Sequence, residues 1–189
     1  MMRIFTDFDG PIMDVSERYY QVYQFCLRET KRPEQAVTQL SKAEFWRMKR
    51  SRVPERKIAR HSGLDAEQAG TFAHLRRDTV HSLPNLIHDR LVPGAVTALE
   101  QFQTAGVKPI IVTMRKTREL NYALDQYDLH RFFPRERCYC LGDDYVKTTD
   151  VEEKPRLMQA ALQAFPPMAT TWMIGDTEAD VVAAQANQV

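Results

Sequence analysis

Two aspartates lie one residue apart where a short apolar segment near the start of the sequence ends. The segment Ile4-Phe5-Thr6 leads into Asp7-Phe8-Asp9, and the turn-forming pair Gly10-Pro11 follows it. Alternate side chains of an extended strand point the same way, so Asp7 and Asp9 would project from one side. Two carboxylates at this range repel each other unless a cation compensates for their charge. The pattern indicates a Mg²⁺-assisted catalytic pair, with two solvated carboxylates at a strand end as the alternative.

Polar residues end two further apolar segments of the sequence. Thr113 follows the β-branched run at 107–112, and Asp176 follows the run at 171–174. Ligands of open parallel sheets bind beyond the carboxyl ends of the strands, where such residues gather. This convergence favours a functional role for Asp7, Asp9, Thr113 and Asp176 together.

The elements that must position these residues alternate between strand and helix after Gly94. Strands are expected at 107–112, 138–141 and 171–174, and helices near 95–105, at 120–127, after Lys154-Pro155 and at 177–186. Gly106 is expected to end the first of these helices in a left-handed conformation. Alternation of this kind predicts an α/β fold with a Rossmann-like parallel sheet covered on both faces.

The segment between the first strand and this alternating region reads as helical throughout. Helices are expected at 16–28, in a short stretch beginning near Pro33, at 43–50, and from a cap at Asp65 to about Leu83. The sequence therefore predicts an α/β core domain made of residues 1–14 and 91–189. An all-helical domain, residues 15–90, is inserted after the first strand.

Charge is unevenly divided between these two parts, although the whole chain carries a formal net charge of only +1. Residues 15–90 hold 15 Lys and Arg against 9 Asp and Glu, and the remainder holds 11 against 16. The balance gives no reason to expect nucleic acid or a membrane as a partner. A basic insert beside an acidic core suits an anionic substrate, and it also suits ordinary solvated helix faces.

Cysteine usage and the termini bear on the compartment. The three cysteines, Cys26, Cys138 and Cys140, are too few for a disulfide framework and suit a reducing environment. The start of the chain has no signal-peptide pattern, and no run of 18 apolar residues occurs. These features predict a cytoplasmic protein.

Four motifs in order resemble those of the haloacid dehalogenase superfamily, in its phosphatase branch, and they extend over nearly the whole chain. They are Asp7-Phe8-Asp9-Gly10, Ile110-Ile111-Val112-Thr113, Lys154-Pro155, and Gly175-Asp176 with Asp180 four residues later. The helical insert resembles the small helical cap of this family. Phosphoglycolate-phosphatase-like enzymes are the nearest group by this analogy.

The resemblance assigns a role to each motif residue. Asp7 is expected to be the nucleophile that forms an aspartyl-phosphate, and Asp9 the acid–base residue. Thr113 and Lys154 are expected to bind and neutralise the phosphoryl group. Lys147 is a rival for the lysine role. Arg115 is left open, either as a residue that reaches substrate or as one that only caps the next helix.

A Mg²⁺ ion is the cofactor that the resemblance implies. Asp7, Asp176 and the backbone carbonyl of Asp9 are its expected ligands, and Asp180 is expected either to orient these ligands or to bind the ion through water. Asp143 and Asp144, beside another strand end, are further candidates for supporting the metal. A solvated turn is the simpler interpretation of these two residues.

The expected function is hydrolysis of a phosphomonoester, with a small phosphorylated metabolite as the partner molecule. The expected assembly is a monomer or a weak homodimer, without nucleic acid or membrane. A phosphomutase resembling β-phosphoglucomutase would use the same aspartates and cap. A non-catalytic binding protein on the same fold is the third possibility.

Two features depart from the family pattern. Pro11 stands where family phosphatases usually carry Thr, and proline lacks an N–H donor and fixes φ. The family core continues past the fourth motif with another strand, whereas this sequence reaches Val189 soon after it. An unpaired sheet edge there would favour association.

Overall fold

The computed structural model describes residues 2–146 and 148–189, which form two compact units. The first unit contains Met1–Asp14 and Arg90–Val189, and the second contains Val15–Asp89. Each unit has its own hydrophobic interior and is described by itself. The boundary lies in a two-stranded antiparallel ribbon of β2 (Met13–Asp14) and β3 (Arg90–Leu91), where the chain leaves the first unit and returns to it.

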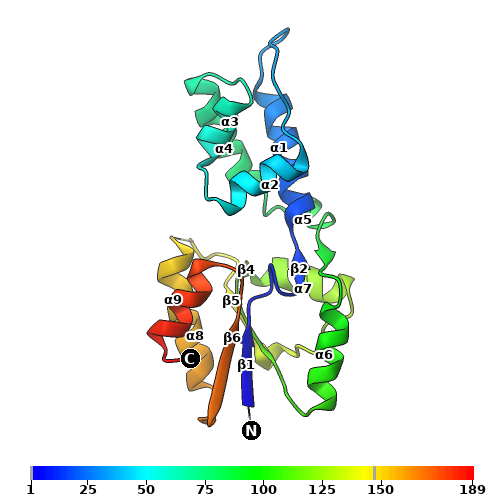
Figure 1. Cartoon of the computed structure of the whole chain (residues 1–189), viewed down its shortest axis with the longest axis vertical. Coiled ribbons are helices and arrows are strands. Elements are labelled where there is room, and N and C mark those ends of the chain that lie inside the picture. The colour runs from blue at the N-terminus through cyan, green and yellow to red at the C-terminus, as the bar shows by residue number, and fades with distance from the viewer. Residues whose placement is uncertain (1, 147) are drawn as a thin grey trace. The chain divides into compact units, whose positions relative to one another are not determined.

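A four-stranded parallel sheet forms the centre of the first unit, in the order β5-β4-β1-β6. The strands are β1 (Met2–Thr6), β4 (Ile110–Lys116), β5 (Cys138–Leu141) and β6 (Thr170–Ile174). Figure 1 shows α8 (Asp150–Gln163) and α9 (Glu178–Ala186) on one face of the sheet, away from α6 (Ala95–Thr104). Helix α7 (Thr117–Gln126) follows β4, and a 3-10 turn (Arg135–Arg137) precedes β5. The predicted fold class, a parallel α/β sheet with a helical insert after the first strand, is confirmed.

The interior on the α8 and α9 side explains why the strands are apolar. Phe5 of β1 pairs in register with Ile110 of β4, and both are almost fully buried. They pack with Met158 and Ala161 of α8 and with Ala183 of α9. A parallel strand buried on both faces is expected to be apolar, and Ile4 and Phe5 of β1 and the segment 110–112 of β4 meet this expectation.

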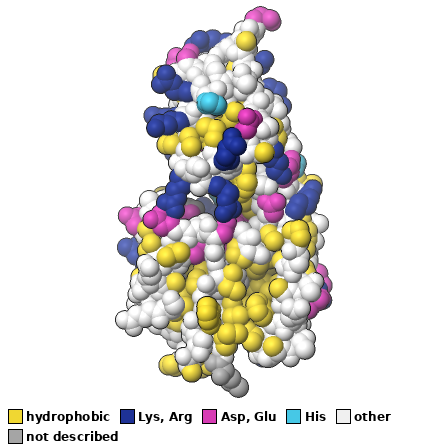
Figure 2. All heavy atoms as spheres, in the orientation of Figure 1, with side chains coloured by type: hydrophobic (Ala, Val, Ile, Leu, Met, Phe, Trp, Pro, Cys, Tyr) yellow, Lys and Arg dark blue, Asp and Glu magenta, His cyan; other side chains and the backbone are white. Residues whose placement is uncertain are grey.

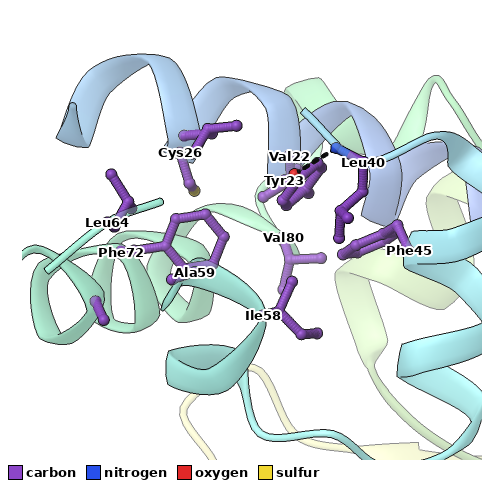
Figure 3. Packing of buried hydrophobic residues seen from close by; sticks show 12 residues of the cluster. Val22, Tyr23, Cys26, Leu40, Phe45, Ile58, Ala59, Leu64, Phe72 and Val80 are labelled. Carbon is purple, nitrogen blue, oxygen red and sulfur yellow. Dashed lines mark hydrogen bonds between the residues drawn. The ribbon is translucent and has the colours of Figure 1, made fainter. Parts of the chain in front are cut away.

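The second unit consists of helices packed around Tyr23. The helices are α1 (Ser16–Thr30), α2 (Lys42–Arg50), α3 (Glu55–His61), α4 (Ala66–Thr79) and α5 (Leu83–Leu86). The Tyr23 ring stacks on Phe45 with centroids 4.8 Å apart. Figure 3 draws both side chains among the buried residues of this unit. The Tyr23 hydroxyl accepts a hydrogen bond from the Leu40 backbone at 2.9 Å and lies 2.8 Å from Ser62 Oγ. Burying a tyrosine requires such partners for its hydroxyl.

The surface of this helical unit is rich in basic side chains. In Figure 2, dark blue Lys and Arg side chains gather over α1 to α4 on the face shown. One arginine is an exception, because Arg18 is fully buried and its Nε lies 2.9 Å from Asp89 Oδ1. The pair joins α1 to the segment that follows α5. No helix among the described residues is long and apolar enough to cross a membrane.

Four expected elements differ from the structure. The helix expected from Asp65 to about Leu83 ends at Thr79, and a separate short helix begins at Leu83. The segment expected to start a helix near Pro33 is irregular up to Ser41. Strand β4 begins at Ile110, not at 107, and continues past Thr113 to Lys116. Helix α8 begins at Asp150, so Lys154 and Pro155 lie within it instead of preceding it.

Candidate active site

Asp7 directly follows β1, where two strands of the sheet end side by side. Its backbone N–H donates to the carbonyl of Ile174, the last residue of β6, at 2.8 Å. Its side chain is buried, and Oδ1 accepts a hydrogen bond from the Phe8 backbone N–H at 2.7 Å. The parallel pairing of β1 with β6 therefore places the Asp7 carboxylate beside the loop that begins at Gly175.

Lys154 of α8 lies between two carboxylates of this sheet end. Its Nζ lies 2.7 Å from Asp7 Oδ2 and 2.5 Å from Asp180 Oδ1, and its side chain is only 1% exposed. The second oxygen of Asp180 accepts hydrogen bonds from the Thr177 backbone N–H at 2.9 Å and from the Thr177 hydroxyl at 2.7 Å. Asp180 thus caps α9 and also binds Lys154.

The electrostatics of this group follow from its burial. Desolvation raises the pKa of Asp7 to about 7, against the opposing effect of Lys154, and the charges of Asp180 and Asp9 add to the rise. Burial alone would lower the pKa of Lys154, but the two carboxylates hold that pKa above its usual value. Because Asp7 and Asp180 share the single ammonium group of Lys154, their negative charge is not fully balanced. The site could therefore hold a further cation.

The oxygen atoms near Asp7 fit a hard divalent cation. One carboxylate oxygen from each of Asp7, Asp176 and Asp180 lies within 4.8 Å of the others. Mg²⁺ takes oxygen ligands and often uses only one or two carboxylates together with water. The chemistry of this donor set would suit Mg²⁺, and Asp180, expected behind the ligands, lies among these carboxylates.

Glycine at position 10 makes room for Asp176. Gly10 has a φ of 95°, a conformation that side chains other than glycine rarely adopt. A Cβ added to Gly10 would collide with the carboxylate of Asp176. The turn after Asp9 therefore approaches the β6 loop closely, and the Asp-x-Asp-Gly sequence carries a steric requirement as well as two carboxylates.

Asp9 has a different cationic partner from Asp7. Arg115 lies on β4, and its Nε donates to Asp9 Oδ1 at 2.7 Å. Its Nη2 also lies 2.6 Å from the same oxygen. Arg115 is 2% exposed along its side chain, whereas Asp9 is 27% exposed.

Thr113 is buried within β4 and does not end the strand. The register pairs Thr6 with Ile111, so Thr113 lies two residues beyond this pair. Its Oγ1 accepts a hydrogen bond from the Arg115 backbone N–H at 3.3 Å. Asp143 accepts from the Arg118 N–H at 2.9 Å and so contacts the first turn of α7. The rival lysine, Lys147, lies outside the described residues.

Sequence reasoning left open what Arg115 does, and the structure pairs it with Asp9. The two residues are 106 positions apart, so no local pattern links them. A cation two residues beyond Thr113 was the available signal, because alternate residues of a strand point to one side. Arg115 also donates through Nη1 to the Glu119 carbonyl, at 3.4 Å.

A family model described as haloacid dehalogenase-like hydrolase matches residues 1–187. The chain belongs to the haloacid dehalogenase-like hydrolase family. The resemblance recognised from the four motifs is thereby confirmed, as is the expectation of a hydrolytic enzyme. A search of curated proteins finds no significant match.

Solved structures of similar fold accompany this family match. A putative phosphatase from Clostridium difficile has a TM-score of 0.72 at 15% identity, covering all of this chain and 81% of its own. A putative phosphoglycolate phosphatase from Lactobacillus plantarum has a TM-score of 0.63 at 21% identity, with 99% and 83% covered. A putative β-phosphoglucomutase from Thermotoga maritima has 0.60 at 20% identity, with 100% and 82% covered. At these identities the likeness shows that the hydrolase shares their fold.

Proposed function

We propose that this hydrolase cleaves phosphomonoesters of small metabolites through an aspartyl-phosphate, with Mg²⁺ as cofactor. The observation that carries the proposal is the contact of Lys154 with both Asp7, after β1, and Asp180, in the first turn of α9. A buried carboxylate that borders a cation and further carboxylates suits attack on a phosphoryl group. Neighbours described as phosphatases support the choice of phosphate esters.

Asp7 is the nucleophile in this proposal. A carboxylate oxygen of Asp7 forms a bond to phosphorus, and the bond from phosphorus to the ester oxygen breaks. Asp9 gives a proton to the departing oxygen, so that an alcohol leaves. Asp9 then takes a proton from water, the water oxygen attacks phosphorus, and the bond to Asp7 breaks to release inorganic phosphate.

The remaining residues hold charge in place. Lys154 offsets the charge of Asp7 as the dianionic phosphoryl group approaches it, and its position between two carboxylates fixes the ammonium. The Thr113 hydroxyl, at the same sheet edge, is available to a phosphoryl oxygen. Asp7, Asp176 and the Asp9 carbonyl would hold Mg²⁺, with Asp180 beside them. When bound, the ion supplies positive charge that neutralises the phosphoryl oxygens.

The test is a panel of phosphorylated metabolites, assayed for phosphate release with Mg²⁺ and with excess chelator. Wild-type enzyme should release phosphate from at least one alkyl monoester, and chelator should abolish the release. Asp7→Asn should lower turnover by at least about 10⁴-fold, because the amide is a poor nucleophile. Undiminished turnover of Asp7→Asn would overturn the nucleophile assignment.

A phosphomutase is the second candidate, because the neighbour described as a β-phosphoglucomutase shares this fold. The same aspartates would then transfer the phosphoryl group between two hydroxyls of one sugar. Incubation with sugar monophosphates separates the two functions. Free phosphate without isomerised product supports the hydrolase, and isomerised product without free phosphate supports the mutase.

A further inference from the structure

The Asp9 carboxylate is held by two hydrogen-bond donors of one buried guanidinium. Nε and Nη2 of Arg115 both reach Oδ1, at 2.7 and 2.6 Å. A guanidinium presents its N–H groups in a rigid fork, so two of them on one oxygen fix the position of that oxygen.

Arg115 is itself held by residues on its other sides. Its Cζ lies 5.0 Å from the centroid of the fully buried Phe8 ring, within the range of a cation–π contact. Its Nη1 donates to the carbonyl of Glu119 in α7 at 3.4 Å. The guanidinium thus cannot swing away without losing several contacts.

The contacts of the guanidinium argue against a direct contact with substrate. Three of its N–H groups already have acceptors within the protein, two on Asp9 Oδ1 and one on the Glu119 carbonyl. Asp9 is 27% exposed and is the member of the pair that can meet a substrate. Arg115 therefore acts on the reaction through Asp9 and not by binding the substrate.

We infer that Arg115 is a positioning residue that holds the Asp9 carboxylate in place through two hydrogen bonds to Oδ1. This inference rests on the proposed function, in which Asp9 protonates the leaving oxygen and later deprotonates water. An anchored carboxylate stays in place between the two proton transfers, so loss of Arg115 should slow these steps in particular.

A leaving-group comparison tests this role, because only poor leaving groups need a proton. Two substrates are used: 4-nitrophenyl phosphate, whose leaving group departs unprotonated, and the alkyl monoester that the wild-type enzyme cleaves fastest. Arg115→Met keeps the length and the apolar contact with Phe8 but removes the guanidinium. Its kcat/KM should fall about 100-fold for the alkyl ester and less than about 5-fold for the aryl ester.

Three further variants separate positioning from folding. Arg118→Ala removes an exposed arginine in the first turn of α7 and should leave both substrates within about 2-fold of wild type. Arg115→Ala should recover alkyl-ester turnover with added guanidinium ion and not with added ammonium, since only guanidinium carries the fork. In an Asp9→Asn background, adding Arg115→Met should lower kcat/KM for the alkyl ester by less than about a further 2-fold, because the two residues act as a unit. Thermal melts of each variant accompany the assays.

The outcomes distinguish this inference from the proposed function. Equal losses of kcat/KM on both substrates, or additive losses in the Asp9→Asn background, would overturn the positioning role while phosphatase activity stands. A wild-type enzyme that cleaves neither ester would overturn the proposed function, and the role of Arg115 would fall with it. Selective loss on the alkyl ester with guanidinium rescue supports both.

Discussion

At the scale of single residues, the site depends on how buried charges compensate one another. Asp7 and Asp180 are both buried and share Lys154 as their ammonium partner. Removing the shared cation leaves two buried carboxylates facing each other, which costs more than the loss of an exposed ion pair. The Lys154 side chain therefore contributes both to the stability of the fold and to the proposed chemistry.

Lys154→Met should destabilise the metal-free protein by about 3 kcal/mol, because it leaves two buried carboxylates without their shared cation. Urea unfolding monitored by circular dichroism measures this change. Lys108→Met, at an exposed position before β4, is the control and should change stability by less than about 0.5 kcal/mol. Equal stability of the two variants would show that Lys154 does not compensate the carboxylates.

The raised pKa of Asp7 predicts a pH-dependent stability. Because the pKa rises to about 7 in the folded protein from an ordinary value of 3.8, folding favours the protonated form. The stability from Asp7 is fully present below about pH 4 and is lost as pH rises through 7. Asp7→Asn does not ionise, so in chelator its Tm should exceed that of wild type by an amount that grows from pH 4 to pH 8, to about 5 °C. A constant difference over this range would contradict the burial argument.

At the scale of elements, the turn between β1 and β2 matters because it approaches the β6 loop. Gly10 combines a positive φ with a steric limit from Asp176, and these two effects can be separated. Gly94, before α6, shares a positive φ of 83° but has open space where a Cβ would lie. The pair of glycines thus forms a matched comparison.

Gly10→Ala should displace Asp176 and weaken Mg²⁺ binding at least about 10-fold, besides destabilising the fold by more than Gly94→Ala. Gly94→Ala should cost only the strain of its φ, about 1 kcal/mol, and leave Mg²⁺ affinity unchanged. Isothermal titration with Mg²⁺ and thermal melts measure the two effects. If both variants bind Mg²⁺ as wild type does, the close approach of Gly10 to Asp176 has no role in the metal site.

Helix boundaries show where local patterns were sufficient and where they were not. Asp65 was expected to cap a helix, and it caps α4 with its side chain accepting from the Gln68 N–H. The helix expected near Pro33 is absent because other elements bind its backbone: Thr38 donates to the Ser62 carbonyl and Leu40 to the Tyr23 hydroxyl. Such tertiary bonds satisfy the backbone groups that a helix would otherwise use.

Helix α8 begins earlier than its local sequence pattern indicated. Pro155 suggested a helix start, yet the helix begins at Asp150 and accommodates Pro155 near its beginning. Acidic residues in the first turn favour this earlier start, because they complement the positive end of the helix dipole. Lys154 therefore projects from a regular helix and not from a loop, which restricts where its ammonium can lie.

At the scale of the whole molecule, charge is divided between the two units. Residues 15–90 carry a surplus of Lys and Arg, and the remainder carries a surplus of Asp and Glu. A basic surface raises the local concentration of anions and speeds their encounter with the protein, and dissolved salt screens this effect.

The kcat/KM for an anionic phosphomonoester should fall about 3- to 10-fold between 0.05 and 0.5 M NaCl, with kcat changed less than about 2-fold. Steady-state kinetics at constant Mg²⁺ measures both constants. A double variant, Arg56→Glu with Arg60→Glu, replaces two exposed cations of the helical unit and should flatten the salt dependence. An unchanged salt dependence in this variant would show that these cations do not attract the substrate.

The sequence alone determined the family, the parallel α/β sheet and the residues at its strand ends. These features depend on local signals: an apolar run must end where Asp7 or Gly175-Asp176 begins, and alternating strands and helices require a parallel sheet. Four short motifs in order were enough to indicate the family, which the family model confirms. The roles given to Asp7, Asp9, Thr113, Lys154, Asp176 and Asp180 remain proposals.

Only the tertiary structure decided which charges meet. It placed Lys154 between Asp7 and Asp180, and it paired Arg115 with Asp9 across 106 positions of the chain. Contacts of this kind depend on strand order and on the register of β4 and β6 against β1, which local propensity does not encode. Burial then set the pKa of Asp7, because desolvation exists only once the fold excludes water from the carboxylate.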